Sequence, residues 1–242
     1  MKLISYFFSL WFGLLFSFIL ILFLPLQWLG LKLLGYKGHK AVVDFMNFLL
    51  VKCLLLLGVS VKYTGEKDLP PATTLIFVSN HQGLFDTPPL SWHFRKHHPK
   101  FVSKIELRDG LPSISFNLRH GGSVLIDRSK KKEALSLLST FGKTIRANNW
   151  SAIIFPEGTR SKNGKPKPFA QSGIKILAKR NPEALIVPVT INNSWKLFRY
   201  GKFPFGLGST ISIHTHAPIP IQSMPMDDLL VKVEAQIKNA IK

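Results

Sequence analysis

A histidine and an aspartate lie five residues apart in the segment 80–86, directly after a short apolar run. An imidazole that contacts a carboxylate can act as a general base, because the carboxylate fixes the tautomer of the ring. On one continuous helix His81 and Asp86 would lie about 140° apart, and on one strand they would face opposite sides. The two side chains therefore meet only if the chain turns between them, and Gly83 permits such a turn. We interpret His81 and Asp86 as a candidate catalytic pair.

The residues on either side of this pair predict its place in the fold. The apolar run 75–79 has the composition of a buried strand. Thr87 followed by Pro88 is typical of the start of a helix. Open α/β sheets present their catalytic groups where a strand turns into a helix. The same spacing also arises by chance, so a loop histidine beside an aspartate that caps a helix remains an alternative.

Strand-like and helix-like segments alternate from residue 61 to the C-terminus. The predicted strands cover 73–79, 101–104, 123–126, 152–155, 185–191 and 211–216. The predicted helices cover 88–97, 112–120, 131–148, 169–180 and 226–241. This alternation predicts an α/β fold with a mostly parallel central sheet flanked by helices. Pro188 lies inside one predicted strand, which we therefore expect at a sheet edge or with a bulge.

The N-terminal region is strongly apolar and predicts a membrane anchor. Residues 3–24 carry no charge and are long enough to cross a bilayer as a helix. We expect Pro25 and Gly30 to end this run. The second apolar run contains Asp44 and Lys52, whose charges are costly in the middle of a membrane. These features favour a helical hairpin held in one leaflet and the interface, with two crossing helices as the alternative.

The charge of the chain indicates anionic partners. Its 32 Lys and Arg against 13 Asp and Glu give a formal net charge of +19, most of it in residues 61–242. Such a surface attracts phospholipid, phosphorylated substrates, acidic proteins or nucleic acid. The single cysteine, Cys53, excludes an internal disulfide and fits a reducing compartment. We divide the chain into membrane-anchoring helices at 1–60 and an α/β domain at 61–242.

Two further predicted strands end in residues that suit an anionic ligand. The strand 123–126 leads into Asp127 and Arg128, and the strand 152–155 leads into Glu157, Gly158 and Arg160. Arginine binds phosphate through two parallel hydrogen bonds, and glycine lets backbone N–H groups approach a ligand. Taken singly, each arginine is equally well explained as a surface charge and each glycine as part of an ordinary turn.

Taken together and in order, these segments resemble a known family. The matching segments are Asn80-His81-x4-Asp86, Lys104-x-Glu106-Leu107 leading to Ile126-Asp127-Arg128, Phe155-Pro156-Glu157-Gly158-Thr159-Arg160-Ser161, and Val187-Pro188-Val189-Thr190. The chain resembles the glycerolipid acyltransferases over residues 60–220, and most closely the bacterial 1-acylglycerol-3-phosphate acyltransferases (PlsC-like). It departs from them after Pro112, where Ser113-Ile114-Ser115 stand in place of a glycine that the family often has.

The resemblance implies a reaction and a set of site residues. His81 would be the general base, oriented by Asp86, and would activate the free hydroxyl of lysophosphatidate. That oxygen would attack acyl-CoA or acyl-carrier protein directly, without an acyl-enzyme, to give phosphatidate. The family places its phosphate contacts at Lys104, Arg128 and Arg160, and its glycerol contacts at Glu157 and Gly158, with Thr159 as a further substrate-binding residue. Backbone N–H groups around the turns at Gly83 or Gly158 could stabilise the oxyanion.

The resemblance also carries expectations about partners and place. It implies a phospholipid membrane as partner, no metal, no cofactor apart from the acyl donor, and no nucleic acid. It implies a location at the bacterial inner membrane with the catalytic domain on the cytoplasmic face. Two alternatives remain. The acceptor could be another lysolipid, such as a lyso-ornithine lipid, or the chain could be a basic, membrane-anchored binding protein without chemistry, for which a His–Asp pair has no use.

Two other groups of residues could carry function. His93, His97 and His98 have a spacing that suits a metal, but Arg95 and two lysines surround them and no carboxylate accompanies them. A solvated basic face is the better interpretation. Residues 195–208 interleave aromatic and basic side chains, which suits either a membrane interface or a half-buried hairpin.

Overall fold

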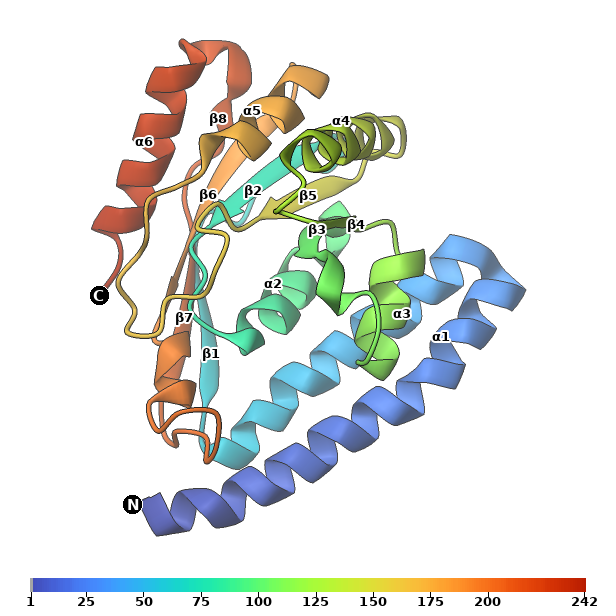
Figure 1. Cartoon of the computed structure of the whole chain (residues 1–242), viewed down its shortest axis with the longest axis vertical. Helices are drawn as coiled ribbons and strands as arrows, with labels where there is room; N and C mark the ends of the chain where they lie inside the picture. The colour runs from blue at the N-terminus through green and yellow to red at the C-terminus, as the bar shows by residue number, and fades with distance from the viewer. Residues whose placement is uncertain (1) are drawn as a thin grey trace.

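A computed structural model describes residues 2–242 of the chain as a central sheet between two layers of helices (Figure 1). The strands are β1 (Ser60–Gly65), β2 (Leu75–Ser79), β3 (Pro99–Lys104), β4 (Val124–Ile126), β5 (Ser151–Ile154), β6 (Leu185–Asn192), β7 (Thr210–Thr215) and β8 (Ile219–Pro220). The α-helices are α1 (Lys2–Cys53), α2 (Thr87–His93), α3 (Pro112–His120), α4 (Lys131–Ala147), α5 (Gln171–Arg180) and α6 (Met226–Asn239).

The strand order is β1-β7-β6-β2-β5-β3-β4, and β8 pairs with β6. The run from β6 to β4 is parallel throughout, and β1 is parallel to β7. β6 pairs antiparallel with β7 and with β8. The mostly parallel α/β sheet expected from the sequence is therefore confirmed. Because the run from β6 to β4 is parallel, the loops that follow these strands leave the same edge of the sheet.

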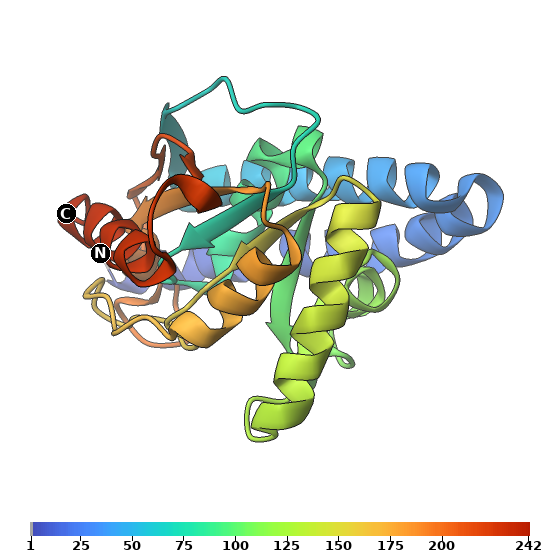
Figure 2. The ribbon, with the colours of Figure 1, turned by 90° about the horizontal axis from the view of Figure 1, so that it is seen from above.

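Helices cover both faces of the sheet and create two cores (Figure 2). α1 and α2 pack on one face, and α4, α5 and α6 pack on the other. Successive side chains of β2 alternate between the two cores: Phe77 belongs to the first, and Ile76 and Val78 belong to the second. Every residue of β2 is buried, as expected of a parallel strand that is covered on both sides.

Pro188 lies in an interior strand, so the expectation of an edge position is wrong. β6 lies between β2 and β7, and Pro188 is aligned with Val78 of β2. On the other side of β6, β8 pairs with residues 185–186 and β7 pairs with residues 189–192. Pro188 falls between these two pairings, where its missing N–H interrupts neither ladder.

α1 is a hairpin of two helical legs that meet at Gly35. Gly35 has φ 60° and ψ −147°, so the chain reverses there, between leg 1 (residues 2–34) and leg 2 (residues 36–53). Helix continues through Pro25 and Gly30, so the expected break at those residues is wrong. The close approach of the legs explains two glycines: a Cβ on Gly38 would lie 2.5 Å from the carbonyl oxygen of Gly30.

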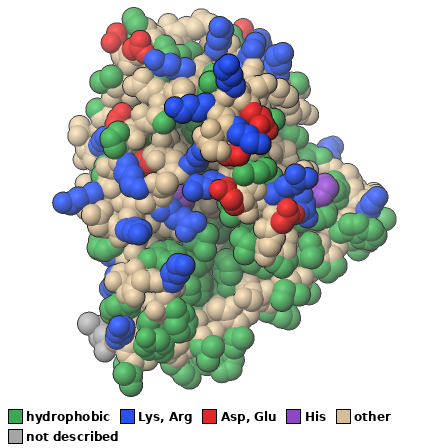
Figure 3. Space-filling model, viewed as in Figure 1, with side chains coloured by type: hydrophobic (Ala, Val, Ile, Leu, Met, Phe, Trp, Pro, Cys, Tyr) green, Lys and Arg blue, Asp and Glu red, His purple; other side chains and the backbone are tan. Residues whose placement is uncertain are grey.

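Both legs pack on the α/β region as well as on each other. Between the legs, Gln27 Nε2 lies 3.4 Å from Met46 Sδ. Leg 1 also contacts the α/β region directly, because the Ser113 hydroxyl donates a hydrogen bond to the Leu20 carbonyl. The opposite face of leg 1 is exposed and apolar. Figure 3 shows hydrophobic side chains gathered over α1, whereas lysines and arginines spread over the rest of that face.

Candidate active site

His81 and Asp86 meet in the loop that follows β2. His81 Nδ1 lies 2.8 Å from Asp86 Oδ2. The same oxygen accepts the backbone N–H groups of Gln82 at 2.7 Å and Gly83 at 2.9 Å. An ionised carboxylate only accepts hydrogen bonds, so Nδ1 carries the proton and the other ring nitrogen, Nε2, is the basic one. Asp86 is fully buried, whereas the His81 side chain keeps 17 % of its surface exposed.

Contacts with neighbouring strands hold this loop in place. The Asn80 side chain pairs with the backbone of Ile191, donating to its carbonyl at 2.8 Å and accepting its N–H at 2.7 Å. The His81 carbonyl accepts the N–H of Ser161 at 2.7 Å. The His81 ring stacks on Phe155, with centroids 4.1 Å apart and an interplanar angle of 16°. The imidazole is therefore held by the Phe155 ring, which packs on its face, and by the hydrogen bond to Asp86.

Glu157 lies behind the same loop. Its Oε1 accepts the backbone N–H of His81 at 2.8 Å, and its Oε2 accepts the N–H of Lys167 at 2.8 Å. Burial raises the pKa of the Glu157 carboxyl, and the N–H groups of Lys167 and His81 oppose that shift. Both carboxylate oxygens are thus engaged by backbone groups.

A cavity of about 770 Å³ opens in front of His81 at the carboxyl edge of the parallel strands. Six of the residues predicted for the site line it: His81, Lys104, Arg128, Gly158, Thr159 and Arg160. Asp86 and Glu157 are not lining residues; they support the loop from behind. The cavity thus combines one basic imidazole with cations from the ends of β3, β4 and β5, an arrangement that suits a substrate bearing both a hydroxyl and an anionic group.

Gly158 allows Arg128 to cross the backbone of the loop after β5. Gly158 has φ +71°, a conformation that side chains rarely adopt, and a Cβ there would lie 2.8 Å from Arg128 Nη1. The glycine therefore serves two purposes, turning the chain and admitting the guanidinium. Thr159 makes its own contact, because its hydroxyl accepts a hydrogen bond from the Lys167 ammonium.

The two backbone donors suggested for an oxyanion are occupied in this structure. The N–H of Gly83 donates to Asp86, and the N–H of Gly158 donates to the Phe155 carbonyl at 3.1 Å. These two N–H groups are therefore engaged within the protein, and a backbone donor elsewhere around the two turns stays a prediction.

Sequence reasoning missed several residues of the site. Gln82 is 2 % exposed, and its side chain links two loops, donating to the Gly164 carbonyl at 3.4 Å and accepting the Ser194 N–H at 3.1 Å. Trp195 and Lys202 line the cavity. The mixed aromatic and basic composition of 195–208 was a signal for these two, whereas nothing in the local sequence marks Gln82.

The histidines considered as metal ligands point to separate neighbours. The His93 ring stacks on the Tyr63 ring, with centroids 4.2 Å apart. His98 Nδ1 forms a hydrogen bond of 2.8 Å with the Tyr36 hydroxyl. Within residues 2–242, no group of three or more His, Cys, Asp or Glu side chains is placed to hold a metal ion.

Comparison with known proteins gives the family. The family model described as Acyltransferase matches residues 60–192, more than half of the chain. The chain belongs to the acyltransferase family. The matched region contains His81, Asp86, Arg128 and Glu157. The resemblance found in the sequence is confirmed, and the chain is an enzyme.

Individual relatives extend beyond the matched region. The chain is 24 % identical to the 1-acyl-sn-glycerol-3-phosphate acyltransferase alpha of Ovis aries over 210 residues, which cover 86 % of this chain and 71 % of that protein. It is 35 % identical to the 1-acyl-sn-glycerol-3-phosphate acyltransferase of Helicobacter pylori over 147 residues, 59 % of this chain and 57 % of that protein. The crystal structure of the 1-acyl-sn-glycerophosphate acyltransferase PlsC from Thermotoga maritima has the same fold, with a TM-score of 0.78 at 24 % identity over 99 % of this chain and 95 % of that one.

Proposed function

We propose that this acyltransferase transfers an acyl group from an acyl thioester to the free hydroxyl of lysophosphatidate and so forms phosphatidate. The observation that carries the proposal is the position of His81: it faces a cavity whose other walls hold Lys104, Arg128 and Arg160. The names of these relatives point to the same acceptor. The donor is acyl-CoA or acyl-carrier protein. Because the thioester already activates the acyl group, the reaction needs no resident cofactor.

The geometry suggests how the chain performs this step. His81 Nε2 takes the proton of the acceptor hydroxyl as the oxygen attacks the thioester carbonyl. Asp86 holds the ring and stabilises the imidazolium that forms. The tetrahedral intermediate then expels the thiolate, which recovers the proton from His81. The carbon–sulfur bond is replaced by a carbon–oxygen bond, and the products are phosphatidate and the free thiol. The cations on the cavity wall hold the phosphate group of the acceptor.

We further propose that the enzyme works at a membrane surface, with α1 as its anchor. Within residues 2–242, the segment Lys2–Leu57, which holds both legs of α1 and the turn after them, is long and apolar enough to cross a membrane. Leu33 and Leu34, beside the bend at Gly35, are each 71 % exposed. Apolar surface of this kind is stabilised in lipid. The basic α/β domain then lies on the anionic cytoplasmic face of the bacterial inner membrane.

An acyl-transfer assay tests the function. The purified enzyme in lipid nanodiscs is given acyl-CoA or acyl-carrier protein, and thiol release is measured with and without lysophosphatidate. We expect release only when the lysolipid is present, with phosphatidate identified by mass spectrometry. A parallel series with lyso-ornithine lipid and monoacylglycerol measures acceptor preference. Transfer to one of these but not to lysophosphatidate would overturn the assignment of the acceptor.

A further inference from the structure

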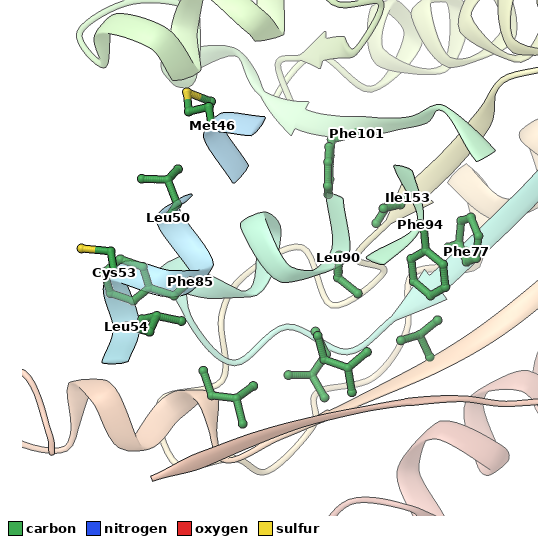
Figure 4. Packing of buried hydrophobic residues seen from close by; sticks show 14 of the residues in the cluster. Met46, Leu50, Cys53, Leu54, Phe77, Phe85, Leu90, Phe94, Phe101 and Ile153 are labelled. Atoms are coloured by element: carbon green, nitrogen blue, oxygen red, sulfur yellow. The ribbon is translucent and has the colours of Figure 1, made fainter. Parts of the chain in front are cut away.

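Aromatic side chains from three separate segments meet directly behind residues 81–86, which we call the catalytic loop. Phe85, which is 3 % exposed, lies at their centre. Its ring centroid is 5.3 Å from that of Phe12, 5.4 Å from Phe16, 5.5 Å from Phe205 and 5.7 Å from Phe198. We call these five residues the aromatic cluster. Figure 4 shows the place of Phe85 in the core between leg 2 of α1 and α2.

Phe85 immediately precedes Asp86 in the chain. Asp86 Oδ2 binds the His81 ring and the N–H groups of Gln82 and Gly83, which makes residues 81–86 one hydrogen-bonded unit. Among residues 81–86, Phe85 is the one whose large apolar side chain is buried in the core. The buried ring and the carboxylate that binds the imidazole are thus carried by adjacent residues of the same short segment.

The other members of the cluster belong to the membrane hairpin and to the cavity wall. Phe12 and Phe16 are on leg 1 of α1, and Phe198 lines the substrate cavity. A hydrogen bond joins the two sides, because the N–H of Phe205 donates to the Ser9 hydroxyl at 2.8 Å. One continuous packing arrangement thus connects leg 1, the cavity wall and the catalytic loop.

We propose that Phe85 is a positioning residue through which leg 1 of α1 sets the geometry of the His81–Asp86 pair. Closely packed rings do not deform continuously, so a displacement of Phe12 or Phe16 displaces Phe85 and, with it, Asp86. Displacements of about 1 Å lower catalytic rates strongly. The pair is fully formed only when the hairpin is seated on the domain. This inference rests on the proposed function for its kinetic test, and on the geometry alone for its structural test.

The kinetic test uses Phe12→Leu, Phe85→Leu and the double variant. We expect each single variant to lower kcat about tenfold, to leave KM for lysophosphatidate nearly unchanged, and to shift the pH–rate profile. Because both act through one contact, we expect the double variant to be no slower than the worse single variant. The matched control is Phe23→Leu: Phe23 is 3 % exposed in the same leg, but it packs on Phe45 within the hairpin, 5.9 Å away.

The structural test does not depend on the substrate. The enzyme is labelled with ¹³C-histidine, and the His81 ring signal is assigned by its loss in His81→Gln. We expect this signal to move or broaden in Phe12→Leu and Phe85→Leu, and to stay in place in Phe23→Leu. If Phe85→Leu does not fold, Phe16→Leu takes its place. An unmoved His81 signal, additive kinetic losses, or an equal loss in Phe23→Leu would overturn the proposal. If the wild-type enzyme transfers no acyl group to lysophosphatidate, the proposed function is overturned, but this inference is not.

Discussion

The Glu157 carboxylate and the backbone of His81 are joined by a hydrogen bond of 2.8 Å. This bond ties the loop after β5 to the loop after β2, which are neighbours in the sheet but 76 residues apart in sequence. The second oxygen of Glu157 holds Lys167, whose ammonium in turn reaches the Thr159 hydroxyl. One carboxylate thus binds both the loop that carries His81 and the segment that carries Lys167, a cation in the wall of the cavity.

Glu157→Gln is expected to lower kcat by about tenfold to a hundredfold, with little change in KM for either substrate. The amide keeps one acceptor oxygen, but its NH₂ group faces a backbone N–H and leaves that donor unpaired, which costs about 1–3 kcal/mol. Steady-state kinetics with lysophosphatidate and acyl-CoA measure both parameters. Glu183→Gln, an exposed site before β6, is the control. A raised KM for the acceptor with normal kcat would instead support direct contact with glycerol.

His81→Ala is expected to lower the rate of acyl transfer by about 10²–10⁴-fold, because a positioned general base contributes that much. Asp86→Asn is expected to be severely impaired as well, since the amide cannot accept three hydrogen bonds at one oxygen while fixing the tautomer. Thiol release from acyl-CoA measures both effects. His120→Ala, at the exposed end of α3, should behave like the wild type. Near-normal turnover of His81→Ala would contradict the assignment of the base.

The sequence predicts those parts of the site that depend on the residues of a local turn or on the parallel order of the strands. A strand, a glycine turn and a proline at the start of a helix sufficed to bring His81 and Asp86 together. The parallel sheet then placed Arg128 and Arg160 at the same edge. The supporting role of Glu157 could not be predicted, because the partner it holds depends on which strands become neighbours.

The same limit explains the errors in the fold. Pro188 occupies an interior strand because β7 and β8 happen to leave a gap beside it. Helix continues through Pro25, where one face of leg 1 packs on the rest of the chain through contacts such as the bond from Ser113 to the Leu20 carbonyl. In both cases partners distant in sequence override a local preference.

Arg128→Ala and Arg160→Ala are expected to raise KM for lysophosphatidate about tenfold or more, because a charge-assisted hydrogen bond contributes about 1.5–3 kcal/mol. The effect should be much smaller with monoacylglycerol, which lacks the phosphate. The comparison of KM for the two acceptors isolates the phosphate contact. Arg146→Ala, exposed in the last turn of α4, controls for the loss of a positive charge. Equal losses with both acceptors would show that the two arginines are structural.

Lys100 is expected to make stability depend on pH. It is 6 % exposed, and its ammonium bonds to the Tyr36 hydroxyl at 2.9 Å and lies 4.4 Å from the Trp150 ring centroid. Burial and the charge of Lys40 lower the pKa of Lys100 from 10.5 to about 7, and Asp44 opposes the shift. Between these two values the unfolded chain binds a proton that the folded chain does not. Raising the pH through this window therefore favours the folded state, by about 1.4 kcal/mol per pH unit.

Comparison with Lys100→Met isolates this contribution, since methionine does not titrate. We expect the Tm of the wild type, measured relative to that of Lys100→Met in detergent, to rise as the pH is raised from about 7 to about 9. Lys104→Met removes a lysine from the other end of the same strand and serves as the control. A Tm difference that does not change with pH would mean that Lys100 keeps its charge in the folded protein.

The bend of the hairpin is expected on the same side of the membrane as the catalytic domain. Leg 1 touches the domain at points far apart along its length, because Ser9 accepts the N–H of Phe205 and Leu20 accepts the hydroxyl of Ser113. A helix that crossed the bilayer would carry one of these contacts into lipid, where unpaired polar groups are costly. We therefore expect leg 1 to lie along the membrane surface, with its exposed apolar face in one leaflet.

Single cysteines near the bend test this topology in a Cys53→Ala chain. Gly35 and Gly38 are poor positions, because Gly35 has positive φ and a side chain at Gly38 would strike Gly30. Leu33→Cys and Lys37→Cys replace exposed side chains on either side of the bend. Each is treated with a membrane-impermeant thiol reagent in intact cells and in inverted vesicles, with Ser136→Cys on α4 reporting the side of the domain. We expect the bend to react only from the side on which Ser136→Cys reacts, because its apolar face enters one leaflet alone. Reaction of the bend from the opposite side would show that the legs span the membrane.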